Sequence, residues 1–382
     1  MDDDPAILGG LQNLLYRDRK RWDLVFAPGG DVALEEIRKQ PFDIVVSDMR
    51  MPHVDGATLL NVIKDECPST VRIMLSGQAD REAIVRALPA LHQLLSKPCD
   101  AATLRAALER SLGGADVERD ARIRRIVGGL DKLPTPPDIY FDLTRLMQSP
   151  TTSVGDVAKV VMRDPGLAAK LLQLVNSAYF GAGQVTTSIQ QAVSRLGTEQ
   201  LRYIALTASV FASPEPREAW FSLPDLQRGS MSAANLAREL AEPAGRDEAF
   251  ASTLLHDIGH LVLALGRGPE FDAFREGARD GAPELDLEVE RSLIGVTHAD
   301  IGARLLAIWG LPSTIVDAVQ FHHDPGSAPE PCRRLASIVH VADTLVQHLP
   351  VRNQLNLESL ERAGTAQLVP GWLAIAKRSV TA

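Results

Sequence analysis

The sequence predicts an α/β doubly wound parallel sheet followed by an all-α helical domain. Over residues 1–112, short apolar runs alternate with helical patterns, an order typical of a parallel sheet covered by helices on both faces. From Leu133 onward the strand signals vanish, and amphipathic helices follow one another almost without a break. The 382 residues suffice for two or three domains, and a composition of 45% hydrophobic and 23% charged residues is that of a globular protein.

Five segments of the first domain show a clear pattern, in the order helix, strand, helix, strand, helix. The helices have apolar residues at helical spacing. The strands are continuous, β-branched apolar runs, which are typical of strands buried on both faces of a sheet. The five segments are residues 31–39, 42–48, 58–65, 71–76 and 101–110.

Glycine and charge mark the end of the first domain. Gly113 and Gly114 interrupt the last helical pattern, and the charged stretch over residues 116–125 predicts a helical linker. The sequence therefore divides into a first domain over residues 1–112, a linker helix over 113–130, a helical domain over 131–345 and a C-terminal tail of short helices over 346–382.

Charge and hydropathy exclude several classes of protein. The 40 basic and 49 acidic residues give a net charge of −9, which disfavours electrostatic binding of nucleic acid. Residues 188–201 have helix-turn-helix spacing but no basic face, so we expect no direct DNA binding. No apolar run approaches the ~20 residues that span a bilayer, and the N-terminus is acidic, unlike a signal peptide. We therefore expect a cytoplasmic protein without membrane contact.

Acidic, hydroxyl and ammonium groups are expected at one edge of the sheet. In a parallel α/β sheet, ligands bind beyond the carboxyl ends of the strands. Carboxylate oxygens suit Mg²⁺, which keeps waters for a phosphate group, and a lysine offsets the charge of a transferred phosphoryl group. The chemistry implied is phosphorylation of Asp48. The residues expected at this edge are Asp48, Ser76 and Lys97, which end strands, and Asp2 and Asp3, which precede the first helix.

These residues stand in motifs that resemble the receiver domain of response regulators. The motifs cover residues 48–56, 74–77 and 96–98. The resemblance implies a flavodoxin-like fold, a phosphoacceptor at Asp48 and a sensor histidine kinase as partner. It further implies Mg²⁺ held by Asp3 and Asp48 with Asp2 beside it, and a phosphoryl switch made by Ser76 and Lys97.

Two features depart from the receiver pattern. Leu94 stands three residues before Lys97, where the family usually has an aromatic residue, so the coupling of the switch hydroxyl to that position is altered. The family's first strand should precede Asp2, and Met1 stands where a β-branched residue normally lies. We therefore expect the receiver to lack its first strand and the true start of the protein to lie upstream.

Histidines gather in the helical domain, where seven of the nine fall within 93 residues. His256 and Asp257 follow an apolar run and precede small residues, as at a helix end that faces a pocket. Adjacent His and Asp can offer a terminal ligand and a bridging carboxylate to divalent metals, which activate water for phosphoester hydrolysis. The further candidates for this site are His298, His322, His323 and Asp343.

The remaining histidines are predicted to have structural positions. We expect His260 and His340 to be hydrogen-bonded histidines of helices. His53 and His92 are expected at the surface.

Residues from about 120 to 345 resemble the HDOD domain, a regulatory relative of the HD superfamily of metal-dependent phosphohydrolases. The resemblance implies an HD-like helical fold and a signalling role, generally without demonstrated catalysis. The motifs that carry it lie at residues 133–137, 163–167, 176–181, 191–197, 255–259, 298–302, 309–312 and 322–325.

The helical domain departs from its family at Gly229. The family usually has His-Ser at the start of the helix before the His-Asp pair, and Gly229-Ser230 stands there instead. Glycine offers no ligand, and the Gly-Tyr-Pro signature of relatives that cleave cyclic di-GMP is also missing. We therefore expect the hydrolase activity to be lost. The other site residues either hold a divalent metal through an incomplete shell or pack as hydrogen-bonded core residues.

The sequence thus predicts a response regulator of a two-component phosphorelay. Phosphorylation of Asp48 would control an HDOD output domain that binds a protein or nucleotide partner, through packing against the linker or a second protomer of a homodimer. One alternative is a working metal-dependent phosphohydrolase or phosphodiesterase regulated by the receiver. Another is an unphosphorylated scaffold whose missing first strand is supplied by another chain.

Overall fold

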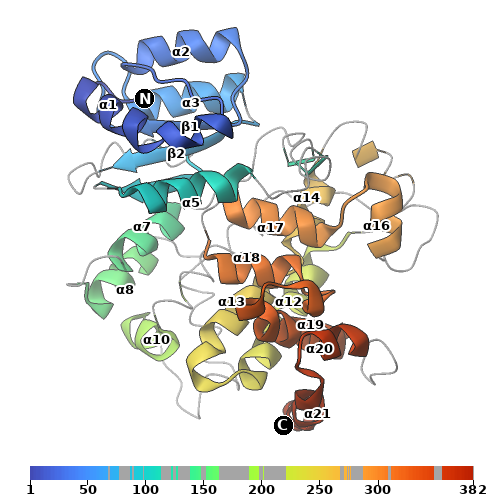
Figure 1. Ribbon diagram of the computed structural model, residues 1–382. Helices are drawn as coiled ribbons and strands as arrows, with labels where there is room; N and C mark the ends of the chain where they lie inside the picture. Colours follow the sequence, from blue (N-terminus) through green and yellow to red (C-terminus); the bar gives the residue numbers. More distant parts are fainter. Residues whose placement is uncertain are drawn as a thin grey trace. The chain divides into compact units, whose positions relative to one another are not determined.

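The computed structural model (Figure 1) divides into two compact units, which we describe separately. The first unit comprises Met1–Asp138 with Gly266–Gly268 and Arg304–Gly310, and the second comprises the remaining residues. No helix among the described residues is long and apolar enough to cross a membrane. The structure describes residues 1–67, 69–76, 87, 90–97, 99–112, 122–123, 126–127, 138–147, 152–162, 189–197, 201, 221–266, 271–272, 274, 276, 287–308, 311–347 and 355–381.

The strands of the first unit form a parallel sheet. Its described strands are β1 (Ile44–Asp48), β2 (Val71–Ser76) and β3 (Gln93–Ser96), in the order β1-β2-β3. The register pairs Asp48 with Leu75 and Ser76 with Ser96. The carboxyl ends of the strands therefore meet at one edge, where the sequence predicts the acidic site.

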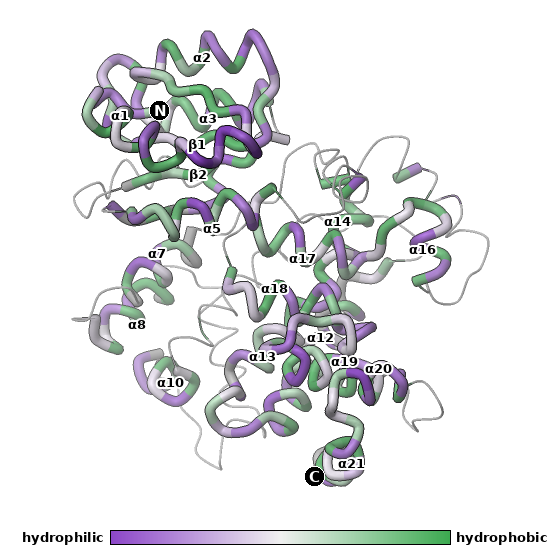
Figure 2. Tube along the Cα trace, viewed as in Figure 1, coloured by the Kyte–Doolittle hydropathy of each residue, from purple (hydrophilic) through white to green (hydrophobic). Residues whose placement is uncertain are grey.

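Helices cover both faces of this sheet. In Figure 1, α3 lies on one side of β1 and β2 and α5 lies on the other. Figure 2 shows hydrophobic and hydrophilic residues alternating along α2, as expected for a helix with one buried face. This arrangement confirms the predicted doubly wound α/β class. The helices of the unit are α1 (Pro5–Leu14), the 3₁₀ helix η1 (Tyr16–Lys20), α2 (Gly30–Lys39), α3 (Gly56–Glu66) and α5 (Ala101–Leu112).

A close approach of backbones fixes the loop between β1 and α3. The Asp55 side chain accepts a hydrogen bond from the Thr58 N–H at 2.8 Å and caps α3. A Cβ at Gly56 would lie 2.1 Å from the carbonyl oxygen of Asp48, so only glycine lets α3 begin against the end of β1. His53, which is exposed as predicted, takes a positive φ of 64° within this loop.

The described residues of the second unit form helices joined by turns and loops, with no strand among them, which confirms the predicted all-α class. His256 and Asp257 join two of its helices end to end, and His298 begins a third. The α-helices from residue 138 onward are α7 (Asp138–Met147), α8 (Val154–Met162), α10 (Ile189–Leu196), α12 (Leu223–Leu240), α13 (Arg246–Leu255), α14 (Ile258–Leu265), α16 (Leu287–Ile294), α17 (His298–Ile308), α18 (Ser313–Gln320), α19 (Arg333–Gln347), α20 (Leu357–Arg362) and α21 (Val369–Thr381).

Two apolar clusters form the core of this unit. One joins α7, α8 and α10 to Phe250 and Leu254 of α13. The other joins α12 and α19 to the C-terminal helices α20 and α21, where Leu360 and Trp372 are buried. The last two helices therefore belong to the packed core of the helical unit.

The prediction that His92 lies at the surface is wrong. His92 is fully buried, and its backbone N–H donates to the Arg72 carbonyl at 2.9 Å where the chain enters β3. Its ring lies against the buried Arg72 guanidinium, with His92 Nε2 2.8 Å from Arg72 Nη2. Most of the predicted linker over residues 113–130, the motifs at 133–137, 163–167 and 176–181, and Gly77, Pro98, Trp309 and Gly310 lie outside the described residues.

Candidate functional site

The first candidate site is an acidic pocket formed by Asp2, Asp3, Asp48 and Lys97. Asp48 ends β1 and Lys97 follows β3, while Asp2 precedes α1. The Lys97 ammonium donates to Asp2 Oδ2 at 3.0 Å and also contacts Asp48 Oδ1. Asp2 and Asp48 are buried, with 1% and 8% of their surface exposed, whereas Asp3 is exposed. The pocket thus combines two shielded carboxylates with one cation.

Backbone amides hold these carboxylates in place. The Arg50 N–H donates to Asp48 Oδ2 at 3.1 Å, and the Asp4 N–H donates to Asp2 Oδ1 at 3.1 Å. In each carboxylate, one oxygen is therefore fixed by the chain while the other faces Lys97. Burial by itself would lower the pKa of Lys97, but hydrogen bonds to Asp48 and Asp2 raise it, so the ammonium stays charged.

The three acidic side chains suit a hard cation. Ligand oxygens of Asp2, Asp3 and Asp48 lie within 4.8 Å of one another, and Mg²⁺ in proteins is held by a few carboxylates together with water. Ser76 ends β2 on the neighbouring strand, so the backbone places it at the same edge of the sheet. Its side chain, like that of Leu94, lies outside the described part of the structure.

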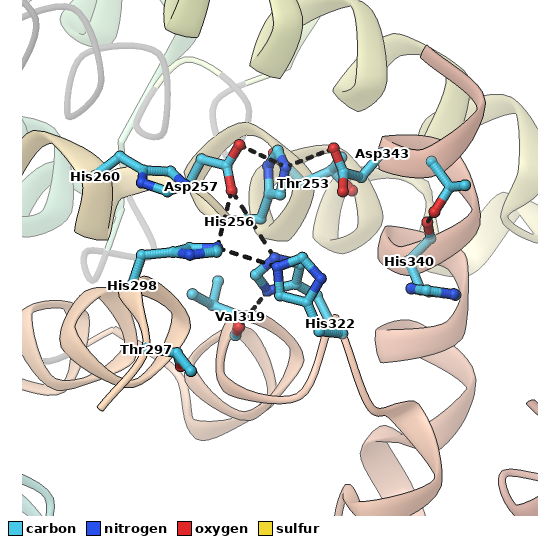
Figure 3. Close-up of polar contacts among 12 residues, drawn as sticks. Thr253, His256, Asp257, His260, Thr297, His298, Val319, His322, His340 and Asp343 are labelled. Atoms are coloured by element: carbon cyan, nitrogen blue, oxygen red, sulfur yellow. Dashed lines mark hydrogen bonds and ion pairs between the residues drawn. The ribbon is translucent and has the colours of Figure 1, made fainter. Parts of the chain in front are cut away.

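The second candidate site is a histidine cluster in the helical unit, which Figure 3 shows. Asp257 lies at its centre, with Oδ1 3.3 Å from His298 Nε2 and 3.9 Å from His322 Nε2. The structure brings together all six residues expected there and adds two more. The members of the histidine cluster are His256, Asp257, His260, Glu290, His298, His322, His323 and Asp343.

Three of these imidazoles are fixed through Nδ1. His256 Nδ1 donates to the Thr253 carbonyl and His322 Nδ1 to the Val319 carbonyl, both at 2.6 Å. His298 Nδ1 donates to the Glu290 carboxylate at 2.8 Å. Since a carbonyl or carboxylate oxygen only accepts, Nδ1 carries the proton in each ring. The Nε2 atoms of these rings therefore face the centre of the cluster.

The central nitrogens are short of partners. His256 Nε2 lies 3.2 Å from both Asp257 Oδ2 and Asp343 Oδ1, yet it has no partner in hydrogen-bond geometry among the described residues, and the same holds for His322 Nε2. His298 Nε2 and His323 Nε2 lie 3.1 Å apart. Buried, converging nitrogens next to carboxylates are the donor set of a divalent transition metal, so the residues present fit such an ion.

When no metal is bound, protonation of histidines supplies the positive charge beside the carboxylates of the cluster. Burial would lower the pKa of His298, but the carboxylates of Glu290 and Asp257 raise it to about 10. Burial and the neighbouring His298 lower the pKa of His260 to about 4. Burial and nearby histidines likewise hold the pKa values of His322 and His323 well below their usual range. His260, His322 and His323 therefore stay neutral beside a protonated His298.

Sequence reasoning missed Glu290 and assigned His260 only a structural position. Glu290 is fully buried and accepts from both the backbone N–H of His298, at 2.7 Å, and its ring. His260 stacks on His298 with ring centroids 3.9 Å apart and lies 3.7 Å from Glu290. The sequence does contain a signal for Glu290. This charged residue lies on the same apolar face of α16 as Leu287 and Ile294.

Two glycines of the helical unit differ in the space around them. A Cβ at Gly259 would lie 1.9 Å from the His298 carbonyl oxygen, so glycine lets α14 begin against the first residue of α17. Gly229 lies within α12, and a Cβ placed there would meet no described atom within 4 Å. The described residues thus leave room at Gly229, the position where the sequence predicts a lost ligand.

Comparisons with known proteins match both units. The model of the HDOD domain matches residues 133–325, and that of the response regulator receiver domain matches residues 1–109. The chain is 31% identical over 321 residues to the transcriptional regulatory protein ZraR of Escherichia coli K12, covering 80% of this chain and 64% of that protein. It is 28% identical over 230 residues to an uncharacterized protein of Treponema pallidum, covering 59% of this chain and 44% of that protein.

A solved structure shares the helical fold. An HDOD domain protein with unknown function from Geobacter sulfurreducens aligns with a TM-score of 0.55 and 26% identity, covering 69% of this chain and 97% of that one. The chain spans less than two thirds of the lengths of the two curated relatives.

Proposed function

Because the chain belongs to the HDOD domain family and is a response regulator with an N-terminal receiver domain, we propose that Asp48 accepts a phosphoryl group from a sensor histidine kinase. The observation that carries this proposal is the pairing of Lys97 with both Asp2 and Asp48 at the carboxyl end of the sheet. A shielded carboxylate beside a fixed cation and a second carboxylate is the arrangement that phosphoryl transfer to an acid requires.

Each pocket residue has a role in this transfer. An oxygen of Asp48 attacks phosphorus of the donor phosphohistidine while the P–N bond breaks, and the donor imidazole leaves with the electron pair. The Arg50 N–H holds the attacking carboxylate, and Lys97 stabilises the charge on the transferred group. Mg²⁺, held by Asp3 and Asp48 with Asp2 beside it, would neutralise charge on the phosphoryl oxygens.

The test uses a small phosphodonor. Incubation of the full chain with acetyl phosphate and Mg²⁺ should add the mass of one phosphoryl group, and Asp48→Asn should not gain it. Asp65→Asn is the matched control, because Asp65 is an exposed residue of α3 outside the pocket. No mass gain on the wild-type chain, or an equal gain on Asp48→Asn, excludes Asp48 as the acceptor.

The helical unit is proposed to act by binding rather than by turnover. Gly229 removes one ligand position, and catalytic metal sites depend on a full set of ligands in the correct geometry. The surface of the HDOD domain would then bind a protein or nucleotide partner in a way that depends on phosphorylation of Asp48.

A second candidate function is metal-dependent phosphoester hydrolysis. It is favoured by the buried Nε2 atoms of His256 and His322, which converge beside Asp257 and Asp343. Purified protein with Mn²⁺ and bis(p-nitrophenyl) phosphate decides between the two. Hydrolysis that is lost in Asp257→Ala and kept in the exposed control Asp225→Ala supports an enzyme, whereas equal background rates in all three support the binding role.

A further inference from the structure

The loop that follows α18 carries two members of the histidine cluster. We call residues 321–327 the histidine loop; it contains His322, His323 and Asp324 and ends in the 3₁₀ helix η4 (Pro325–Ser327). The ring of His322 is fully buried, and Nε2 of His323 lies 3.1 Å from Nε2 of His298. The chain turns here instead of continuing as a helix, so contacts from other elements help to fix where the two rings lie.

The C-terminal helix α20 contacts the histidine loop through Asp324. The Ser359 hydroxyl donates to Asp324 Oδ1 at 2.6 Å, and Arg362 Nη2 donates to the same oxygen at 2.7 Å. Ser359 is fully buried, and its Oγ also accepts from the Gly326 N–H at 2.9 Å. Hydrogen bonds to a carboxylate are among the stronger ones in proteins. Two residues of α20, which lies beyond the segment 133–325 matched by the HDOD model, therefore hold the loop directly after its histidines.

The backbones of the loop and of α20 also approach each other closely at Gly326. A Cβ at this position would lie 2.8 Å from the Ser359 carbonyl oxygen and 2.7 Å from Arg362 Cβ. Because the first of these atoms belongs to the backbone, a side chain at residue 326 would push the loop away from the helix. The loop is therefore packed against α20 as well as hydrogen-bonded to it.

The same helix is bonded to α19, which carries Asp343. His340 Nε2 accepts from the Asn356 backbone N–H at 3.1 Å, and Figure 3 shows His340 on the same helix as Asp343. Asn356 in turn caps α20, because its Oδ1 accepts from the Ser359 N–H at 3.0 Å. The start of α20 thus joins the histidine loop to the helix of Asp343, so that it contacts two ligand-bearing elements at once.

We propose that Ser359 and Arg362 are positioning residues of the histidine cluster, which act through Asp324 to set where the rings of His322 and His323 lie. The C-terminal helix α20 is then a part of the site. The expected effect on a bound metal rests on the metal site of the second candidate function, whereas the effect on the two rings does not.

The first test observes the rings in the metal-free full chain. Nitrogen NMR with ¹⁵N-labelled histidine compares the wild type with the double variant Ser359→Ala/Arg362→Ala. We expect the ring resonances of His322 and His323 to shift in the double variant, while those of His92 in the α/β unit stay in place. The matched control is Glu361→Ala, an exposed residue of the same helix, which should leave every ring resonance as in the wild type.

A conservative substitution separates positioning from a loss of bulk at the helix surface. Arg362→Lys keeps a cation beside Asp324, whereas Arg362→Ala removes it. We expect the two ring resonances to shift less in Arg362→Lys than in Arg362→Ala. Equal shifts in these two variants would contradict a role for the charge of Arg362.

The second test measures Mn²⁺ binding by isothermal titration calorimetry. The double variant should bind Mn²⁺ about tenfold to hundredfold more weakly than the wild type, as is usual when groups that orient metal ligands are removed, and Glu361→Ala should bind as the wild type does. If the wild-type chain binds no Mn²⁺, the metal site of the second candidate function is wrong, and the ring resonances alone decide the positioning role.

Unchanged resonances of His322 and His323 in a folded double variant overturn the proposal, and so does wild-type affinity for Mn²⁺ in that variant. Denaturant unfolding shows whether the double variant is folded. If it is not, Arg362→Ala decides by the same NMR readout, because the Arg362 side chain is 50% exposed and its removal leaves the core intact. Unchanged resonances of both rings in Arg362→Ala would then overturn the proposal.

Discussion

Three histidines of the cluster have one ring nitrogen fixed by a neighbour, and this decides what the other nitrogen can do. Glu290 plays this part for His298 and also binds its backbone N–H. Carboxylates that hold a ligating histidine in this way fix its tautomer and raise its basicity. With a metal at His298 Nε2, Glu290 would act on it through His298, as a positioning residue.

Removal of the Glu290 charge should weaken metal binding. Glu290→Gln is expected to lower the affinity of the purified protein for Mn²⁺ or Zn²⁺ by about tenfold to hundredfold, measured by isothermal titration calorimetry. Glu288→Gln on the exposed side of the same helix is the control and should bind as the wild type does. Equal affinities in all three proteins would remove Glu290 from the site.

Metal binding should also release protons. The pKa of His298 is raised to about 10, so at pH 7 its ring carries the proton that a metal must displace from Nε2. Since deprotonation is required, the apparent affinity rises with pH, by about tenfold per unit for one displaced proton, until the pH exceeds that pKa. Calorimetry in buffers of different ionisation enthalpy measures the release. A binding enthalpy that is independent of the buffer would contradict it.

Residue types and motifs were enough to predict which carboxylates and histidines belong together, but not the buried partners. Glu290 and His260 stand in no ligand motif, and their part in the cluster comes from the crossing of α14, α16 and α17. His92 was misplaced for the same reason, because its burial depends on the pairing of β3 with Arg72 in β2.

At the scale of elements, local patterns predicted β1, β2, α2, α3 and α5 within a few residues. Buried β-branched runs and amphipathic spacing are properties of the segments themselves. The packing of α20 and α21 into the core could not be predicted from local patterns, because it depends on which helix faces meet in three dimensions.

The loop from β1 to α3 gives a prediction at this scale. Gly56→Ala places a Cβ 2.1 Å from the Asp48 carbonyl oxygen, so α3 must shift, with a loss of about 1–3 kcal/mol in the free energy of unfolding and slower phosphorylation. Gly10→Ala in α1 is the control, because no described atom lies within 4 Å of its Cβ position, and it should stabilise the protein by about 0.5–1 kcal/mol. Denaturant unfolding measures both, and equal stabilities would contradict the close approach.

At the scale of the whole molecule, each unit carries its own site. The acidic pocket belongs to the α/β unit and the histidine cluster to the helical unit. The receiver model matches residues 1–109 and the HDOD model residues 133–325, and we propose that the HDOD domain is the output of the receiver. Phosphorylation of Asp48 should therefore alter the helical unit.

Hydrogen exchange of the full chain with and without acetyl phosphate and Mg²⁺ measures this coupling most directly. We expect phosphorylation to slow or speed exchange both in the loop after β1 and in helices of the second unit, and we expect Asp48→Asn to show neither change. A phosphorylated wild-type chain whose exchange changes only within the α/β unit would contradict it.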